Sequence, residues 1–251
     1  MSFMADTRCN CSVRAASNFG ARGNGLSIDM LVIHYTGMES GKAAIDWLCA
    51  EESGVSCHYL VEEDGSILQM VPELHRAWHA GKSEWQGITD TNSRSIGIEI
   101  VNPGHDHGYQ DFPDDQISAV IDLSRDILDR NQIPARNILA HSDVSPGRKQ
   151  DPGERFPWRL LWEKGVGHWT AEDVDNAPFA MPGHSSEETA AVRALLSTYG
   201  YGIEVSPDYD DVTKECVIAF QQHFRQSRVD GVADIGTYRT LERLIASVPS
   251  A

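Results

Sequence analysis

The stretch "IDMLVIHYT", residues 28–36, is a short apolar run rich in β-branched side chains. A run of this length and composition predicts a buried β-strand. His34 lies at the carboxyl end of the expected strand. A second histidine, His141, ends another short apolar run, "NILAH" at residues 137–141, which predicts a second strand. The chain therefore places two imidazoles at the carboxyl ends of two strands, where open α/β sheets collect their chemistry.

Neighbouring segments predict the rest of an α/β domain. In "RSIGIEIVN", residues 94–102, three isoleucines alternate with other residues, so a strand should carry them on one face and Glu99 on the other. Asp64-Gly65 separates two strand-like runs and is a strong hairpin signal. Helical spacing of apolar residues predicts a helix over 114–130, and "GKAAIDWLCAEESG" predicts a shorter one that stops at a glycine. Strands alternating with helices are typical of an α/β fold.

The carboxyl-terminal third has a different pattern. Residues 163–188 are rich in Gly, Pro and acidic residues without a clear period, which predicts a linker. From residue 187 onward, apolar residues recur at helical spacing in three short segments, so we expect a small all-α domain of three helices. The predicted organisation is a domain at 1–165, a flexible linker at 166–186 and a second domain at 187–251. A chain ending near Gly165 should then still fold.

Composition limits the classes of partner. Lys+Arg number 21 against 37 Asp+Glu, a formal net charge of -16, which argues against binding to nucleic acid. Five cysteines without a metal-type pattern indicate reduced thiols. The chain has neither an apolar run long enough to span a membrane nor the apolar core of a secretory signal near its start. These features predict a cytoplasmic protein, with the cell envelope as the alternative if an upstream signal is missing.

Five polar residues form the candidate site. His34, His141 and Asp151 are a three-ligand set for catalytic zinc, which leaves a fourth position for water. The loop "HSDVSPGRKQDPG", residues 141–153, would return Asp151 to the metal. Lys149 lies two residues before Asp151, and in an extended segment both side chains face the same side, where an ammonium could stabilise a reacting oxyanion. Glu99 would be the general base beside the metal.

Each of these residues also has an ordinary structural interpretation. A histidine at a strand end is more often a capped surface group than a ligand. Glu99 could form an ion pair with Arg94 or face solvent, and Lys149 with Asp151 could be a solvated pair in a loop. From spacing alone, the combined site is therefore a hypothesis.

The first domain resembles the zinc-dependent N-acetylmuramoyl-L-alanine amidases of type 2. The matching stretches occur in the family's order over about residues 20–160: "IDMLVIHYTG", "SCHYLVEEDGSILQMV", "RAWHAGKS", "NSRSIGIEIVN" and "AHSDVSPGRKQDPG". The resemblance implies a mixed β-sheet flanked by helices and one zinc ion. It implies that His34, His141 and Asp151 are the zinc ligands, Glu99 the catalytic acid/base and Lys149 the oxyanion stabiliser.

The resemblance also implies a substrate groove bordered by His79, in the "WHAG" segment, and, as a weaker match, by Tyr59. Residues 187–246 resemble the type 1 peptidoglycan-binding module, without identifying residues that contact a ligand. The implied activity is hydrolysis of the amide between N-acetylmuramic acid, or its 1,6-anhydro form, and L-alanine. Two alternatives from other classes are a non-catalytic peptidoglycan sensor and a metallopeptidase that cuts within the stem peptide. The oligomeric state and the preferred stem peptide stay open.

Overall fold

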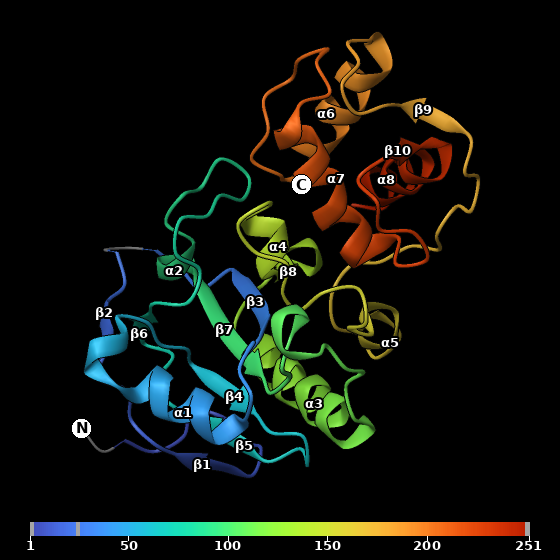
Figure 1. Ribbon diagram of the computed structural model, residues 1–251. Helices are drawn as coiled ribbons and strands as arrows, with labels where there is room; N and C mark the ends of the chain where they lie inside the picture. Colours follow the sequence, from blue (N-terminus) through green and yellow to red (C-terminus); the bar gives the residue numbers. More distant parts are fainter. Residues whose placement is uncertain (1–2, 24–25, 249–251) are drawn as a thin grey trace.

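The computed structural model describes residues 3–23 and 26–248. Its amino-terminal part is built on a six-stranded mixed sheet in the order β1-β5-β4-β7-β3-β8 (Figure 1). The strands are β1 (Cys11–Val13), β3 (Met30–Tyr35), β4 (Tyr59–Val61), β5 (Ile67–Gln69), β7 (Ser95–Ile100) and β8 (Ile138–Ala140). Only the β4–β5 hairpin is antiparallel, whereas the other pairs in the sheet are parallel. The expected mixed sheet flanked by helices is confirmed.

The predicted strands lie at the centre of this sheet. β3 and β7 are paired in parallel and almost fully buried, and β3 is a near-continuous apolar run, as is typical of a strand covered on both faces. The hairpin turns at Gly65, whose φ of 81° is a conformation that glycine adopts without strain. Two three-residue strands, β2 (Phe19–Ala21) and β6 (His75–Ala77), pair with each other outside the main sheet and were not predicted.

Helices cover both faces of the sheet. α3 (Asp114–Arg130) packs its apolar side on one face, against the isoleucines of β7. α1 (Gly41–Cys49) packs near Leu60 on the other face, and Ser40 caps its first turn. The remaining short elements of this part are α2 (Thr91–Arg94), α4 (His141–Val144), α5 (Trp158–Glu163) and 3₁₀ turns at Glu51–Ser53, His105–His107 and Ala135–Asn137.

The carboxyl-terminal part contains the three expected helices, α6 (Glu187–Tyr199), α7 (Asp211–Phe224) and α8 (Ile235–Ser247). Each begins at a Ser or Asp whose side chain accepts from a backbone N–H three residues later, the usual N-cap arrangement. The part is not purely helical, because β9 (Pro178–Ala180) and β10 (Ala233–Asp234) form a small antiparallel pair. Within the described ranges, no helix combines the length and apolarity needed to cross a bilayer.

The segment predicted as a flexible linker is packed instead. Val166 is buried in the core of the sheet domain, and Trp169 contacts both that core and the helical one. Further along, β9 pairs with β10, and the carbonyl of Asp175 accepts from the N–H of Gly236 at 2.7 Å. Sequence reasoning missed this packing because much of it uses backbone groups, which every residue type carries.

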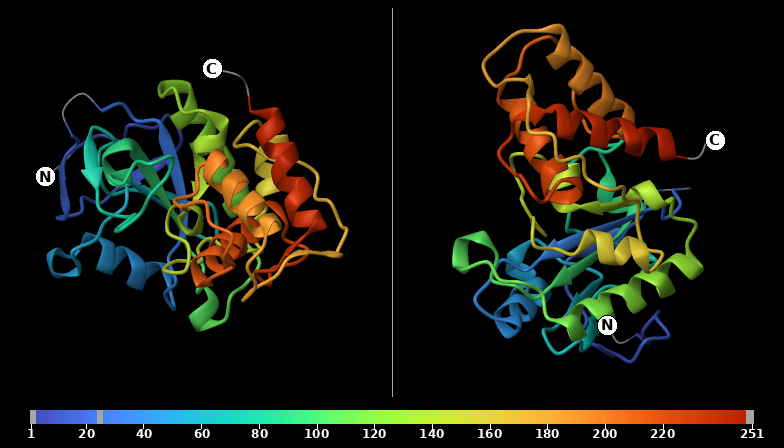
Figure 2. Two further views of the ribbon diagram at one scale, coloured as in Figure 1. Left: turned by 90° about the horizontal axis from the view of Figure 1, so that it is seen from above. Right: turned by 90° about the vertical axis from the view of Figure 1, so that its right-hand side faces the viewer.

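The helical part shares a hydrophobic core with the sheet domain. Figure 2 shows the three helices lying against one end of that domain. The shared core joins sheet-domain residues to residues of α6, α7 and their connection; its members include Met30, Trp85, Leu139, Val144, Leu196, Tyr199, Tyr201 and Phe220. The two parts are therefore one packed unit rather than two tethered bodies.

Candidate metal and catalytic site

Three neighbouring strands bring the candidate residues together. His34 lies on β3 and Glu99 on β7, and the two are direct partners in the parallel register. His141 follows β8, which pairs with the other edge of β3. Because these strands run in the same direction, their carboxyl ends meet at one edge of the sheet. The alternation along each strand places His34 and Glu99 on the face opposite the α3 core, as predicted for Glu99.

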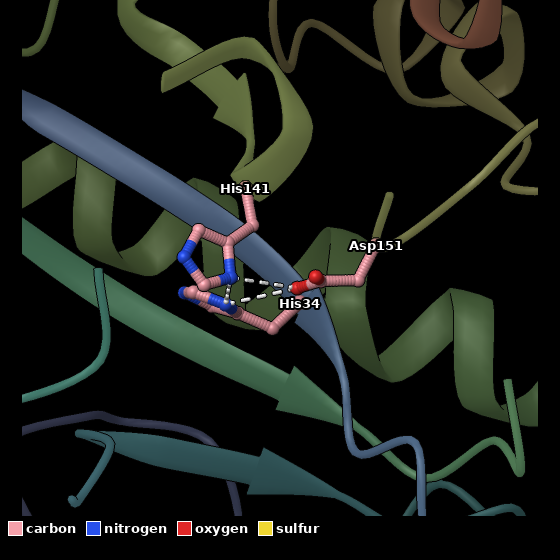
Figure 3. Close-up of side chains that lie close together, drawn as sticks. All are labelled: His34, His141 and Asp151. Carbon is pink, nitrogen blue, oxygen red and sulfur yellow. Dashed lines mark hydrogen bonds and ion pairs between the residues drawn. The ribbon is translucent and has the colours of Figure 1, made fainter. Parts of the chain in front are cut away.

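His34, His141 and Asp151 converge on one point (Figure 3). The His34 Nδ1 atom lies 2.9 Å from His141 Nδ1, and the Asp151 Oδ2 atom lies 3.1 Å and 3.0 Å from these two nitrogens. All three side chains are buried. Ligand atoms of a tetrahedral zinc ion, each about 2.1 Å from the metal, stand about 3.4 Å apart. The three atoms would have to separate by only a few tenths of an ångström, so this cluster fits a metal ion.

The loop after β8 holds Asp151 in place. His141 is the first residue of α4, and the N–H of Ser142 donates to the carbonyl of Asp151 at 3.0 Å, which joins the two ends of the loop. Gly147 and Gly153 have φ values of 73° and 81°, where a side chain would be strained. This loop is irregular because it must return a carboxylate to the two imidazoles.

The protonation states of His34, His141 and Asp151 leave three atoms with lone pairs that can bind a cation. Burial lowers the pKa of His34 to about 4, so its imidazole is neutral near pH 7. His141 Nε2 lies 3.1 Å from the carbonyl of Ala80, which can only accept, so Nε2 carries the proton and Nδ1 keeps its lone pair. Burial by itself would raise the pKa of Asp151, but its interactions with His141 and His34 outweigh burial and hold that pKa below its ordinary range. Two nitrogen lone pairs and a carboxylate oxygen therefore face one another.

Glu99 is placed to exchange protons beside this cluster. Its side chain lines the same cleft, and its Oε2 atom is buried without a hydrogen-bond partner among residues 3–23 and 26–248. Burial, followed by the nearby charge of Asp151, raises the pKa of Glu99 well above its ordinary value. A carboxyl group whose pKa is raised holds an accepted proton well enough to pass it on.

The cleft itself has a volume of about 390 Å³. Lys149 lies at its exposed side, and the indoles of Trp47 and Trp78 line it together with Met38 and Arg148. Sequence reasoning did not identify the two tryptophans as cleft residues. The available signal was the position of Trp78 directly before His79 in the "WHAG" segment. Trp47 had no comparable signal, and only the structure shows that 47% of its surface is exposed.

The two expected substrate-binding residues differ in their surroundings. Tyr59 is fully buried on the α3 side of β4, and its hydroxyl donates to Glu73 at 2.7 Å, so a substrate in the cleft cannot contact it. This expectation is corrected by strand alternation, because Leu60, not Tyr59, is the register partner of Glu99. His79 does line the cleft, but it is only 9% exposed and its Nδ1 atom lies 2.9 Å from His34 Nε2.

All five cysteines fall within the described part of the chain, and none of them is joined in a disulfide there. Cys57 and Cys216 are buried, and burial raises the pKa of both thiols, as is typical of unreactive structural cysteines.

Comparison with protein families gives two matches. A model described as N-acetylmuramoyl-L-alanine amidase matches residues 24–154, which is more than half of the chain. A model described as a peptidoglycan binding domain matches residues 185–241.

Individual proteins match over longer stretches. The N-acetylmuramoyl-L-alanine amidase AmiD of Escherichia coli is 39% identical over 236 residues, which cover 87% of this chain and 82% of AmiD. The 1,6-anhydro-N-acetylmuramyl-L-alanine amidase AmpD of the same organism is 36% identical over 147 residues, 51% of this chain and 78% of AmpD.

Solved structures agree with these matches. AmiD from E. coli, in complex with the substrate anhydro-N-acetylmuramic acid-L-Ala-D-γ-Glu-L-Lys, superposes with a TM-score of 0.74 at 36% identity and covers 93% of this chain and 92% of its own. AmpDh3 from Pseudomonas aeruginosa, in complex with anhydromuramic pentapeptide, superposes with a TM-score of 0.73 at 29% identity and covers 94% and 96%.

Proposed function

The chain belongs to the N-acetylmuramoyl-L-alanine amidase family, and on this premise we propose how its own residues cleave the bond between N-acetylmuramic acid and L-alanine. The observation that carries the proposal is the convergence of His34, His141 and Asp151 beside Glu99 in one cleft. The two imidazole nitrogens and the carboxylate would hold a zinc ion. When bound, zinc would supply Lewis acidity that polarises the scissile carbonyl and acidifies a water molecule.

Glu99 would serve as the proton shuttle. Its carboxylate would take a proton from the attacking water as the water adds to the lactyl carbonyl carbon. Its raised pKa favours keeping that proton until the tetrahedral intermediate collapses and the amino group of L-alanine needs it. The free oxygen atom of Glu99 makes no competing hydrogen bond within the described residues, which leaves it available for this exchange.

Lys149 would stabilise the negative charge that develops on the carbonyl oxygen. Lys149 lines the cleft, is exposed, and lies on the loop that carries Asp151. The Lys149→Met protein should keep its zinc but lose about 10²-fold in kcat, which is the usual effect of removing one oxyanion donor. Lys82→Met is a suitable control, because Lys82 is equally exposed and does not line the cleft. Equal kcat values for the two variants would contradict the assignment.

Muropeptides are the proposed substrate class, with either ordinary or 1,6-anhydro muramic acid. The cleft is lined by Trp47 and Trp78, whose indoles offer flat apolar surfaces for a sugar ring or a peptide. The solved complexes of AmiD and AmpDh3 with anhydromuramic peptides support this choice.

Mass spectrometry of a digested muropeptide tests the proposal. The expected products are the intact stem peptide with a free L-alanine amino group and the complete muramic acid sugar. Activity should disappear when a chelator removes the metal and return when zinc is added. Fragments cut within the stem would indicate a peptidase, and binding without any product would indicate a sensor. Full activity of thoroughly demetallated protein would contradict the role of zinc.

The carboxyl-terminal helices are proposed to bind peptidoglycan, on the basis of the family match over residues 185–241. The complete protein should therefore sediment with insoluble sacculi, and a protein that stays in the supernatant would contradict this role. The five unpaired thiols support a reducing compartment, so we propose the cytoplasm, which cell fractionation would test.

A further inference from the structure

One short segment, residues 79–80, contacts the Nε2 atoms of both histidines of the candidate metal site, on the side of each ring that faces away from Asp151. His141 Nε2 donates to the carbonyl of Ala80 at 3.1 Å. His34 Nε2 lies 2.9 Å from the Nδ1 atom of His79. In each case the ring nitrogen that faces away from the cluster is engaged, so the other nitrogen is the one that faces Asp151.

The direction of the hydrogen bonds behind His34 follows from a single serine. The hydroxyl of Ser95 has one proton, and it donates that proton to the carbonyl of Thr91 at 2.8 Å. Its oxygen, 3.0 Å from His79 Nε2, must therefore accept from that nitrogen. A neutral His79 with its proton on Nε2 has a lone pair on Nδ1, which can accept only from His34 Nε2. These successive hydrogen bonds, from His34 through His79 and Ser95 to the carbonyl of Thr91, place the proton of His34 on Nε2. The Nδ1 atom of His34 is therefore left without a proton.

We propose that His79 is a positioning residue for the metal site: through Ser95 it fixes the tautomer and ring orientation of His34, while the neighbouring carbonyl of Ala80 does the same for His141. Replacing a residue that hydrogen-bonds to a metal-ligating side chain typically lowers metal affinity by about 10–100-fold. The inference deepens the proposed zinc site and rests on it. His79 lines the cleft, as expected of a residue that borders the groove, but the residue is only 9% exposed and both of its ring nitrogens are engaged, which supports a positioning role.

Gly97 and Asn92 fix the position of the His79 imidazole and of its backbone. A Cβ atom at Gly97, in the middle of β7, would lie 2.7 Å from the Cγ and Nδ1 atoms of His79, so any side chain there would displace the ring. The Oδ1 atom of Asn92 accepts from the N–H groups of His79 and Ala80 at 3.1 Å and 2.8 Å, which fixes the segment from which both histidines are held. A glycine inside a buried strand often marks such a close approach.

Zinc affinity, measured by competition with a chelator of known affinity, tests the proposal without relying on catalysis. His79→Leu removes the acceptor for His34 Nε2 and should weaken zinc binding about 10–100-fold. His79→Asn keeps an oxygen acceptor close to the Nδ1 position and should restore affinity to within about threefold of the wild type. The visible spectrum of the cobalt-substituted proteins should change for the leucine variant and return toward the wild-type spectrum for the asparagine variant. Wild-type affinity in His79→Leu, or no rescue by His79→Asn, would overturn the proposal.

A second pair of variants decides the matter if His79→Leu does not fold. Ser95→Ala removes the acceptor that fixes the tautomer of His79 and should lower zinc affinity by about tenfold. Ser124→Ala is the matched control, because Ser124 is equally buried and its hydroxyl has no hydrogen-bond partner in the described ranges. Equal zinc affinities of these two variants would overturn the proposal that Ser95 and His79 fix the tautomer of His34. A wild-type protein that binds no zinc would instead contradict the metal site itself, which separates failure of the proposed function from failure of this inference.

Discussion

Glu99→Gln is expected to retain zinc and to lose at least about 10²-fold in turnover on a soluble muropeptide. Glutamine has nearly the shape of glutamate but cannot take a proton from water. The three converging ligand atoms belong to His34, His141 and Asp151 and not to Glu99, so its replacement should leave them in place. Zinc content by elemental analysis and kcat by product formation are measured on the same preparation.

Asp151→Ala provides the contrast. Asp151 Oδ2 is one of the three converging atoms, so this variant should lose both zinc and activity. Two results would contradict the division of roles: Glu99→Gln near wild-type turnover, or Glu99→Gln as poor in zinc as Asp151→Ala.

Removal of the residues after Gly165 is expected to destabilise the protein and to lower cleavage of small soluble substrates as well as sacculi. Truncation would expose Trp85, Leu139 and Val144, which are now covered by the helical part. Exposing a well-buried large apolar side chain costs roughly 1.5–3 kcal/mol, comparable in sum with the whole stability of a typical domain. Thermal unfolding of the shortened and complete chains, together with assays on both substrates, checks this expectation.

A point substitution tests the same coupling in the complete chain. Asp143, on the helix that starts at His141, is fully buried and accepts from the hydroxyl of Tyr201 at 2.6 Å and from His223 Nδ1 at 2.7 Å. Tyr201→Phe leaves this buried carboxylate without one of its donors, which costs about 1.5–3 kcal/mol. Because Asp143 lies on the helix that starts at His141, the loss should also weaken zinc binding.

Tyr209→Phe is the control for that variant. It also removes a buried hydroxyl, but one that donates to the carbonyl of Gly231 within the helical part. It should lower stability and leave zinc affinity unchanged. If both variants bind zinc like the wild type, or if truncation impairs only the cleavage of sacculi, the carboxyl-terminal part acts as a targeting module and not as a support for α4.

The sequence was informative where a pattern repeats over several residues. β3 is a continuous apolar run, whereas β7, α3 and the three carboxyl-terminal helices have clear periods, and each was found close to its expected place. The three-residue strands β2 and β6 are too short to show an alternation, so they could not be predicted.

The site was predictable to a similar extent. His34, Glu99 and His141 follow from strand ends and alternation, since parallel strands align their carboxyl ends. Tyr59 was expected at the groove only as a weaker match of the resemblance, and the side of the sheet on which it lies depends on the register of β4 on β7, which cannot be known from one strand's sequence. Ser95 had no signature at all, because a serine at the start of a strand becomes part of the site only through the fold that brings His79 beside it.

The parallel pairing of β3 with β7 and β8 also determines when a metal can bind during folding. His34 is 107 residues from His141 and 117 from Asp151 along the chain, so an unfolded chain does not present the three ligands together. Zinc would therefore bind the folded state preferentially and add RT ln(1 + [Zn]/Kd) to its stability, about 2.7 kcal/mol when free zinc is one hundred times Kd. Through this linkage, the zinc available to the cell would set how much of the chain is folded as well as how much is active.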